Sequence, residues 1–368
     1  MIRNLIVLAA LTTSTTLLAE ESAWPHQEGA VDILDIAYPP IEEGGPAINF
    51  LWQETFERPG AQFIQLELLD DSSGASSSFI EITNFTGNVV QKISAQELSE
   101  AGTLFTHLVP GQSVTVSVRG VEDDQFGFKI VSINYDKSGA RFESISEPDE
   151  REHVGRYTGE WELLDAVERS VAKLSYLKNK NGVRKRYVCT GFMVSDSTMI
   201  TNHHCVATAD VCKTTKVLFG YQKSDAFFTA PKEQFGCVKV LKADRNLDVA
   251  LLELDGKPGA VSEWGSLKLS SSVPVTGQKL FLVQHPAGEP KQISDYDCSV
   301  SKSPVNGYEK DLDLAHECDT LGGSSGSPVF NEEGEVIALH HLGMSRSGEF
   351  STLNRAVLSW RIVKFLGN

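Results

Sequence analysis

The stretch Gly322-Gly323-Ser324-Ser325-Gly326-Ser327-Pro328 decides how this chain is interpreted. It places a serine in a glycine-rich turn, and the apolar segments 328–330 and 336–339 follow it, which a flexible Gly/Ser linker would not need. Glycines beside a serine let the backbone fold so that two N–H groups converge on one oxygen atom. We therefore take Ser325 as a candidate nucleophile, and the N–H groups of Gly323 and Ser325 as candidate donors of an oxyanion hole.

Two segments upstream supply the groups that activate a serine hydroxyl. Such a hydroxyl is a poor nucleophile until a base lies within hydrogen-bond reach, and an imidazole suits this role because its pKa is near neutrality. His204, within Thr201-Asn202-His203-His204-Cys205, is the candidate base. Asp248, at the start of the apolar segment 248–254, is the candidate carboxylate that orients the base. Alone, Asp248 could equally be a turn residue before a core strand, but its place between His204 and Ser325 favours the triad.

Other interpretations of these motifs are weaker. The His203-His204-Cys205 cluster could be a zinc site, but adjacent residues rarely direct their side chains to one metal, and no matching Cys/His pair follows. We expect His203 to be an ordinary exposed residue, and we predict no metal or organic cofactor. An esterase or lipase would carry a Gly-x-Ser-x-Gly turn between a strand and a helix. Residues 323–327 do not fit that turn, and Pro328 opposes a following helix.

Length, charge and the first residues limit the class of protein. The 368 residues suffice for about two domains, and the net charge of −16 opposes nonspecific approach to nucleic acid or anionic lipid. Residues 1–19 are interpreted as a signal peptide, because Arg3 precedes a short apolar run that ends in small residues. No other segment is apolar enough to span a membrane. We therefore expect a secreted or periplasmic protein, in which the six cysteines form disulfides.

The first half of the chain contains one predicted domain. Residues 20–50 are polar and contain prolines, so we interpret them as a linker. Residues 51–135 alternate apolar and polar positions, as at Ile64, Leu66 and Leu68. This alternation is typical of half-buried antiparallel strands. We predict a small β-sandwich over this range, which serves as an accessory domain or as a pro-domain.

The second half contains the candidate triad. Residues 136–160 are rich in charge, serine and glycine and are interpreted as a second linker. Residues 161–368 form the second predicted domain, in which short strands and turns dominate. Apolar residues at helical spacing predict one short helix over 161–174 and another over 354–366. The fold class is therefore all-β.

At these residues the chain resembles the chymotrypsin-like (trypsin-like) serine peptidases, and among them the bacterial glutamyl endopeptidase and trypsin-like peptidase group. Thr201-Asn202-His203-His204 is similar to that group's Thr-Asn-x-His loop, and residues 322–330 are similar to its Gly-Gly-Asn-Ser-Gly-Ser-Pro-Val-Phe turn. The order of His, Asp and Ser along the chain is also that of the family. The resemblance covers roughly residues 165–366. It implies a chymotrypsin-like fold of two six-stranded antiparallel β-barrels with the triad in the cleft between them, and a short C-terminal helix.

One position departs from the animal enzymes of this family. Their serine follows an aspartate, which pairs with the new N-terminal ammonium after zymogen cleavage. Here that position is Ser324, which has no charge to offer. Activation through this ion pair is therefore not expected, and a pro-domain would act by steric cover or by another ordering route.

The disulfide pairing is expected from the resemblance, because six cysteines allow many pairings and the sequence alone does not choose among them. We expect a Cys189–Cys205 bond that holds the loop carrying His204. A Cys212–Cys237 bond would then flank a hairpin of the first barrel. A Cys298–Cys318 bond would clamp the loop before the nucleophile.

Substrate preference remains open between two classes. By resemblance to glutamyl endopeptidases, Thr320 and His340 align with residues that bind a substrate glutamate carboxylate, which a hydroxyl and an imidazole could hydrogen-bond. Asp319, however, lies where Lys/Arg-selective relatives keep an anionic pocket floor. Gly343 is expected where the substrate backbone pairs with the enzyme as an added strand. We favour Glu slightly over Lys or Arg.

The predicted function is a secreted serine endopeptidase that acts on protein or peptide substrates through His204, Asp248 and Ser325. The alternative is a catalytically inactive protein that keeps the fold and binds a partner. All three residues and the glycine turn are present, which favours the enzyme.

Overall fold

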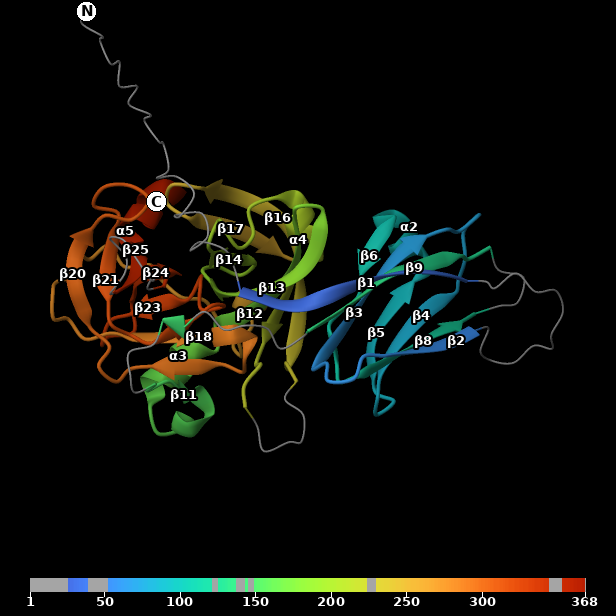
Figure 1. Cartoon of the computed structure of the whole chain (residues 1–368), viewed down its shortest axis with the longest axis horizontal. Helices are drawn as coiled ribbons and strands as arrows, with labels where there is room; N and C mark the ends of the chain where they lie inside the picture. The colour runs from blue at the N-terminus through green and yellow to red at the C-terminus, as the bar shows by residue number, and fades with distance from the viewer. Residues whose placement is uncertain are drawn as a thin grey trace, which may run out of the picture.

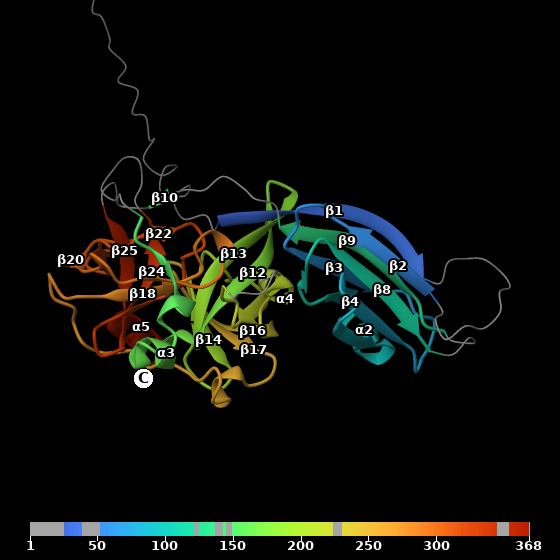
Figure 2. The same cartoon turned by 90° about the horizontal axis from the view of Figure 1, so that it is seen from below.

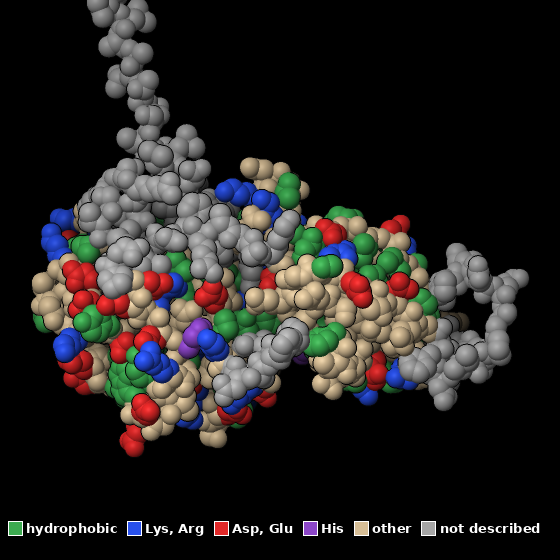
Figure 3. Space-filling view, turned by 60° about the horizontal axis from the view of Figure 1, so that its bottom comes forward, with side chains coloured by type: hydrophobic (Ala, Val, Ile, Leu, Met, Phe, Trp, Pro, Cys, Tyr) green, Lys and Arg blue, Asp and Glu red, His purple; other side chains and the backbone are tan. Residues whose placement is uncertain are grey.

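The computed structural model describes residues 26–38, 52–120, 125–136, 143–144, 149–223, 230–343 and 353–367. The predicted signal peptide, residues 1–19, lies outside the described residues. The chain forms two β-rich lobes that lie side by side, a smaller N-terminal lobe and a larger one that carries the candidate triad (Figures 1 and 2). Acidic and basic side chains are interspersed over both lobes (Figure 3). No helix in the described ranges is long and apolar enough to cross a bilayer.

The N-terminal lobe is a β-sandwich. One sheet has the order β2-β8-β4-β5, and the other places β1, β9, β3 and β6 side by side, with β7 also paired to β3. Alternate apolar residues of both sheets form one core, in which Leu66, Ile80 and Val116 are inaccessible to solvent. The elements of this lobe are β1 (His26–Tyr38), β2 (Trp52–Glu57), β3 (Phe63–Asp70), β4 (Phe79–Asn84), β5 (Val89–Ser94), α2 (Ala95–Ala101), β6 (Thr103–Phe105), β7 (Val109–Pro110), β8 (Ser113–Arg119) and β9 (Phe128–Asp136).

The first half of the larger lobe is a closed six-stranded barrel. Its strands follow the order β12-β15-β16-β17-β14-β13, and antiparallel pairing of β12 with β13 closes it. The helix α4 (Ala209–Thr214) begins at Thr208, whose hydroxyl accepts a hydrogen bond from Val211 N–H. The strands are β12 (Val171–Lys180), β13 (Val183–Met193), β14 (Thr198–Thr201), β15 (Lys216–Phe219), β16 (Glu233–Asp244) and β17 (Val249–Leu254).

The second half of the larger lobe is a sheet of eight described strands, in the order β11-β19-β18-β23-β24-β25-β21-β20. Two short strands, β10 (Glu143–Ser144) and β22 (Thr320–Leu321), form a separate pair. β22 directly precedes residues 322–327, the turn that carries Ser325 and is called the nucleophile turn below. The other elements are β11 (Glu152–His153), η1 (Val154–Tyr157), α3 (Glu162–Glu168), η2 (Pro258–Ala260), β18 (Phe281–Gln284), η3 (Pro286–Gly288), β19 (Gln292–Ser294), β20 (Val300–Val305), β21 (Asp313–His316), β23 (Pro328–Phe330), β24 (Val336–Leu342), β25 (Asn354–Leu358) and α5 (Ser359–Leu366).

The interpretation of residues 20–50 as a linker is wrong for their described part, because residues 26–38 form strand β1. This strand pairs with β9 of the sandwich along most of its length and with β13 of the barrel at its N-terminal end. One hydrogen-bonded sheet therefore runs through both lobes, as the long blue strand in Figure 1 shows. The strand gives no clear period of two, because its apolar and polar residues do not alternate strictly: Ile33 is 77% accessible, whereas Leu34 and Ile36 pack against the sandwich core.

The two predicted helices are shorter than expected. Helix α3 ends at Glu168, and the apolar residues Val171 and Leu174 belong to strand β12 instead. At the C-terminus, residues 354–358 form β25, and α5 occupies only the last part of the predicted range. In both strands residues on both faces are buried, including polar ones such as Lys173 and Arg355, and the apolar residues happen to continue a helical spacing.

The lobes share a buried contact. Phe63 and Leu108 of the sandwich pack against Leu218 and Tyr221 of the barrel, and the rings of Phe63 and Tyr221 lie 5.4 Å apart in an edge-to-face arrangement. The Lys173 ammonium lies within 5.2 Å of both ring centres and donates to the Gly288 carbonyl. The sandwich is therefore packed onto the barrel rather than tethered to it.

Strand β3 shows how the interface uses polar residues. Gln65 and Glu67 are the polar residues that alternate with Ile64, Leu66 and Leu68, and both are buried because that face of β3 meets the barrel. Arg186 donates to Gln65 Oε1 at 2.8 Å, and Arg184 donates to Glu67 Oε2 at 2.6 Å. Buried polar groups are tolerated when they are hydrogen-bonded, so this ladder of pairs fixes the register between the lobes.

We expect Phe63→Ala to lower the free energy of unfolding of the whole chain by about 3–5 kcal/mol, because a buried aromatic ring is removed from the contact between the lobes. Chemical denaturation followed by tryptophan fluorescence measures this. Phe85→Ala is the matched control, since Phe85 is 46% exposed, and its cost should stay within about 1 kcal/mol. Equal stability of the Phe63 variant and the unmodified protein would contradict a shared core.

Candidate active site

Three loops of the larger lobe carry the residues of the expected triad. His204 follows β14, Asp248 immediately precedes β17, and Ser325 lies in the turn between β22 and β23. His204 Nδ1 lies 2.7 Å from Asp248 Oδ2, and the His204 backbone N–H donates to Asp248 Oδ1 at 2.8 Å. The structure therefore places both carboxylate oxygens of Asp248 against the same histidine.

Asp248 is 1% exposed, and its environment decides its charge. Burial alone would raise the pKa of this carboxyl, but the imidazoles of His204 and His341 hold it well below its usual range. The Asn202 side-chain amide also donates to the Asp248 carbonyl at 2.9 Å, which supports the left-handed backbone of Asp248 at φ 49°. A buried, ionised carboxylate of this kind holds an imidazole in one tautomer and orientation.

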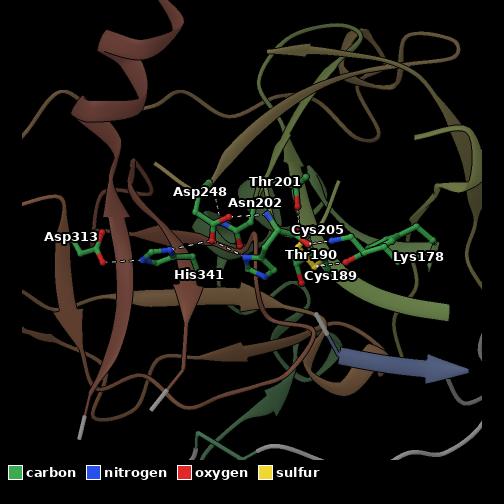
Figure 4. Close-up of polar contacts among 11 residues, drawn as sticks. Lys178, Cys189, Thr190, Thr201, Asn202, Cys205, Asp248, Asp313 and His341 are labelled. Carbon is green, nitrogen blue, oxygen red and sulfur yellow. Dashed lines mark hydrogen bonds and ion pairs between the residues drawn. A yellow bond between two sulfur atoms is a disulfide. The ribbon is translucent and has the colours of Figure 1, made fainter. Parts of the chain in front are cut away.

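The loop carrying His204 is held from two further directions (Figure 4). The disulfide Cys189–Cys205 joins this loop to β13. Lys178 Nζ donates to the His204 carbonyl at 2.6 Å. His203 is half-buried rather than exposed, and burial lowers the pKa of its imidazole.

The nucleophile turn depends on two glycines. Gly323 has φ 102° and Gly326 has φ 90°, in the left-handed region that disfavours side chains. The turn is fastened to β13, because Thr190 N–H donates to the Ser325 carbonyl at 2.8 Å and the Thr190 hydroxyl donates to the Gly323 carbonyl at 2.9 Å. On its other side, Gly326 N–H donates to the His340 carbonyl.

The expected donors of the oxyanion hole are available. Within the described ranges, neither Gly323 N–H nor Ser325 N–H donates a hydrogen bond to another residue. The Ser325 hydroxyl likewise makes no hydrogen bond to His204 there, which is common before a substrate draws the two groups together. The turn can therefore present two N–H groups and a hydroxyl to a ligand.

The sulfur and nitrogen atoms of Cys189, His204 and Cys205 lie within 4.8 Å of one another, as a zinc site would require. Both cysteines are joined in a disulfide, however, and a metal ligand must be a free thiolate. His204 Nδ1 also faces Asp248. These residues do not fit a zinc ion in this state.

The six cysteines form the three expected pairs. Besides Cys189–Cys205, Cys212 of α4 is joined to Cys237 of β16, and Cys298 is joined to Cys318. The last bond precedes the segment that leads to the nucleophile turn.

Comparison with known proteins identifies the larger lobe. Residues 189–339 match the family model described as "Trypsin-like peptidase domain". Over this range the chain matches the trypsin-like peptidases. This range includes His204, Asp248 and Ser325, together with the strands β14, β17 and β23 that border their loops.

Curated relatives resemble this chain over different lengths. "Secreted RxLR effector protein 73" of Plasmopara viticola is 28% identical over 334 residues, which are 86% of this chain and 77% of that protein. "Glutamyl endopeptidase" of Staphylococcus aureus strain MRSA252 is 26% identical over 170 residues, which are 43% of each chain. "Extracellular metalloprotease" of Bacillus subtilis is 25% identical over 175 residues, which are 43% of this chain and 52% of that protein.

Solved structures of proteases also align with the chain. The HtrA-type protease AlgW with a tripeptide has a TM-score of 0.43 at 16% identity, covering 55% of this chain and 61% of its own. The Rv3671c protease of M. tuberculosis in its active form has a TM-score of 0.43 at 18% identity, covering 62% of this chain and 92% of its own.

The structure of the peptidase domain brings the expected specificity residues close to the nucleophile turn. Thr320 lies in β22, is 1% exposed, and its hydroxyl has no hydrogen-bond partner among the described residues. His340 lies in β24, and its Nδ1 is 3.1 Å from Nε2 of His316 in β21. Burial holds the pKa of His340 well below its usual value and lowers that of His316 to about 3, so both are neutral at neutral pH.

Asp319 has a different environment. Its Oδ2 accepts a hydrogen bond from Glu150 N–H at 3.0 Å, and its carbonyl accepts from the side chains of Gln284 and Ser294. The carboxylate is thus engaged by the backbone segment that leads into the peptidase domain. Gly343 directly follows β24.

His316, His341 and Asp313 were not expected at the site. His341 directly follows His340 in β24, and its Nδ1 lies 3.2 Å from Asp248 Oδ2. The signal was the pair His340-His341 itself: successive residues of a strand point to opposite faces, so two adjacent histidines on one buried strand serve two environments. His316 and Asp313 come from another strand, and no local pattern marks them.

We expect Gly326→Ala to destabilise the fold by more than about 3 kcal/mol, because the added Cβ would lie 2.0 Å from the Thr190 carbonyl oxygen and 2.5 Å from Thr201 Oγ1. Gly60→Ala is the matched control: Gly60 has a similar φ of 85° but no atom within 4 Å of the new Cβ. That variant should lose only the backbone strain, about 1–2 kcal/mol. Urea denaturation compares the two, and equal losses would contradict the close packing of the nucleophile turn.

Proposed function

We propose that the protein is a serine endopeptidase that uses His204, Asp248 and Ser325. The observation that carries this proposal is the doubly hydrogen-bonded His204–Asp248 pair beside a turn with two available N–H groups. The matched family is one of peptidases, and one curated relative is a glutamyl endopeptidase. These findings support peptide-bond hydrolysis over a purely binding role.

The proposed reaction proceeds through an acyl-enzyme. Ser325 Oγ attacks the carbonyl carbon of the scissile peptide while its proton passes to His204 Nε2. The carbonyl oxygen becomes an oxyanion that accepts from Gly323 N–H and Ser325 N–H. His204 then gives the proton to the leaving amine, and the C–N bond breaks. Water repeats the sequence on the ester, which frees the acid and restores the serine.

Asp248 remains ionised throughout this cycle. Its low pKa means that the carboxylate does not take up the proton that His204 receives. It stabilises the imidazolium that forms in each half-reaction, and its two contacts keep the ring facing the nucleophile turn.

For specificity we propose cleavage after glutamate. If His340 Nδ1 accepts from His316 Nε2–H, the remaining proton of His340 is on Nε2, where it can be donated to a substrate carboxylate. The unpartnered Thr320 hydroxyl is a second donor. The opposing hypothesis of Lys/Arg preference is weakened, because Glu150 N–H already engages the Asp319 carboxylate.

We further propose that the sandwich is a permanent accessory domain and that the protein is exported. The β1 strand and the buried contact around Phe63 join the two lobes, which a removable pro-domain would not require. Three disulfides are consistent with an oxidising compartment, and one relative is named a secreted protein.

A positional-scanning peptide library digested with the purified protein tests the activity. We expect hydrolysis, and we expect Ser325→Ala to reduce turnover by at least about 10⁴-fold, because the acyl-enzyme cannot form. Ser272→Ala, at an exposed serine outside the site, should retain full turnover. Retained partner binding with no hydrolysis by the unmodified protein would favour the alternative of an inactive binding protein.

The same library tests the specificity. We expect Thr320→Val and His340→Gln each to lower kcat/KM for glutamate substrates by about 10- to 100-fold, because each removes or displaces a hydrogen bond to a charged group. Asp319→Asn should leave glutamate cleavage nearly unchanged, since an amide oxygen can still accept from Glu150 N–H. Cleavage after Lys or Arg that disappears in Asp319→Asn would instead assign the specificity to Asp319.

A further inference from the structure

A second histidine lies behind the candidate catalytic carboxylate. His341 Nδ1 is 3.2 Å from Asp248 Oδ2, and His341 Nε2 is 2.9 Å from Asp313 Oδ2 (Figure 4). Together with the His204–Asp248 contact, these distances form a continuous chain of imidazole and carboxylate groups from His204 to Asp313 in strand β21.

This chain is shielded from water. The side chains of His341 and Asp313 are fully buried, and that of Asp248 is 2% exposed. A neutral imidazole has a single N–H and cannot donate to two carboxylates, whereas an imidazolium has two N–H groups. The geometry therefore requires a charged His341, and the flanking carboxylates raise its pKa to about 9 although burial acts against them.

The surroundings of His341 contain further titratable groups. The Tyr308 ring meets the imidazole edge-on at 5.5 Å, and burial together with both carboxylates raises the pKa of its hydroxyl, which stays protonated. The positive charge of Arg245 acts in the opposite direction and lowers the pKa of the Tyr308 hydroxyl. The remaining histidines nearby are His204, on the far side of Asp248, and the two neutral histidines of the specificity residues, His340 and His316.

We infer that His341 is a positioning residue for catalysis, and that Asp313 holds it in place, so that the working unit is His204–Asp248–His341–Asp313. This inference rests on the proposed serine peptidase function. His341 does not touch the reacting atoms. It acts through Asp248, whose Oδ2 then lies between two imidazoles while Oδ1 accepts from the His204 backbone.

The charge balance explains why two residues are needed. A buried imidazolium beside Asp248 alone would cancel the carboxylate's charge and weaken its stabilisation of protonated His204. Asp313 supplies a second negative charge, so the unit of Asp248, His341 and Asp313 keeps a net charge of about −1. The unit thus gains a fixed hydrogen bond to Asp248 without losing the negative field that His204 requires.

A consequence follows for pH dependence. When His341 loses a proton, its one remaining N–H cannot serve both carboxylates, and Asp248 loses a donor. Activity should therefore fall on the alkaline side near the His341 pKa of about 9. The residue before Ser325 is the uncharged Ser324, so an ion pair at that position does not contribute to this fall.

The first experiment measures kcat/KM against pH in the full chain with the best library peptide. We expect kcat/KM to fall on the alkaline side near pH 9. Asp313→Asn should move the alkaline limb down by about one to three pH units, because one of the two anions that stabilise the imidazolium is gone. The double variant His341→Gln/Asp313→Asn keeps an amide donor toward Asp248 but cannot titrate, so its alkaline limb should disappear.

His107→Gln is the matched control, since it makes the same change at a half-buried histidine of the sandwich and should leave the alkaline limb in place. An alkaline limb that persists unchanged in the double variant would overturn the inference. A purely structural role for His341 would lower activity equally at every pH and would leave the limb where it is.

A second measurement does not depend on turnover. Nitrogen NMR of histidine-labelled Ser325→Ala protein should show both ring nitrogens of His341 protonated at pH 7.5, with the second proton lost near pH 9. A neutral His341 at pH 7.5 would overturn the inference even if hydrolysis is found. Absence of hydrolysis together with a charged His341 would instead count against the proposed peptidase function and leave the bridging geometry standing.

Discussion

The burial of one ionised carboxylate, that of Asp248, determines how the centre of the peptidase domain is built. A carboxylate removed from water is stable only if several donors meet it. Those donors come from the loop after β14 and from β24, which belong to different sheets. Satisfying Asp248 therefore requires the first barrel and the second sheet to pack in one relative position. In that position Thr201, at the end of β14, lies against Gly326 of the turn that carries Ser325.

A second constraint fixes the nucleophile turn. Thr190 of β13 holds the turn through its backbone N–H and its hydroxyl, while β24 holds it through the His340 carbonyl. The carbonyls of Gly323 and Ser325 accept from Thr190, while the N–H groups of the same two residues donate to no residue in the described ranges. The site thus stands on strands rather than on isolated loops, which keeps its geometry precise. The sandwich extends this frame through β1, which pairs with β13 near its middle.

Much of this arrangement could be predicted from local patterns. Alternation located the sandwich strands, and the motifs around His204, Asp248 and Ser325 placed three chemically matched residues in one order. The patterns failed where burial is unusual. Strand β1 mixes apolar and polar residues without strict alternation, so it was taken for part of a linker. Strands β12 and β25 have buried residues on both faces, polar ones included, and their apolar residues happen to continue a helical spacing, so these segments were taken for parts of helices. Apolar and polar residues alternate along a strand only where one face of the sheet is buried and the other is exposed to solvent.

The sequence by itself determined the local chemistry: which serine is the candidate nucleophile, which turn can present two N–H groups, and which histidine precedes a cysteine that can anchor it. These features depend on neighbours a few positions away. Only the tertiary structure decided which groups meet across strands. It placed His341 and Asp313 behind Asp248, set His316 against His340, and engaged Asp319 with the Glu150 backbone. Such contacts depend on sheet register and strand order, which arise from packing the whole chain and leave no periodic trace in any short segment.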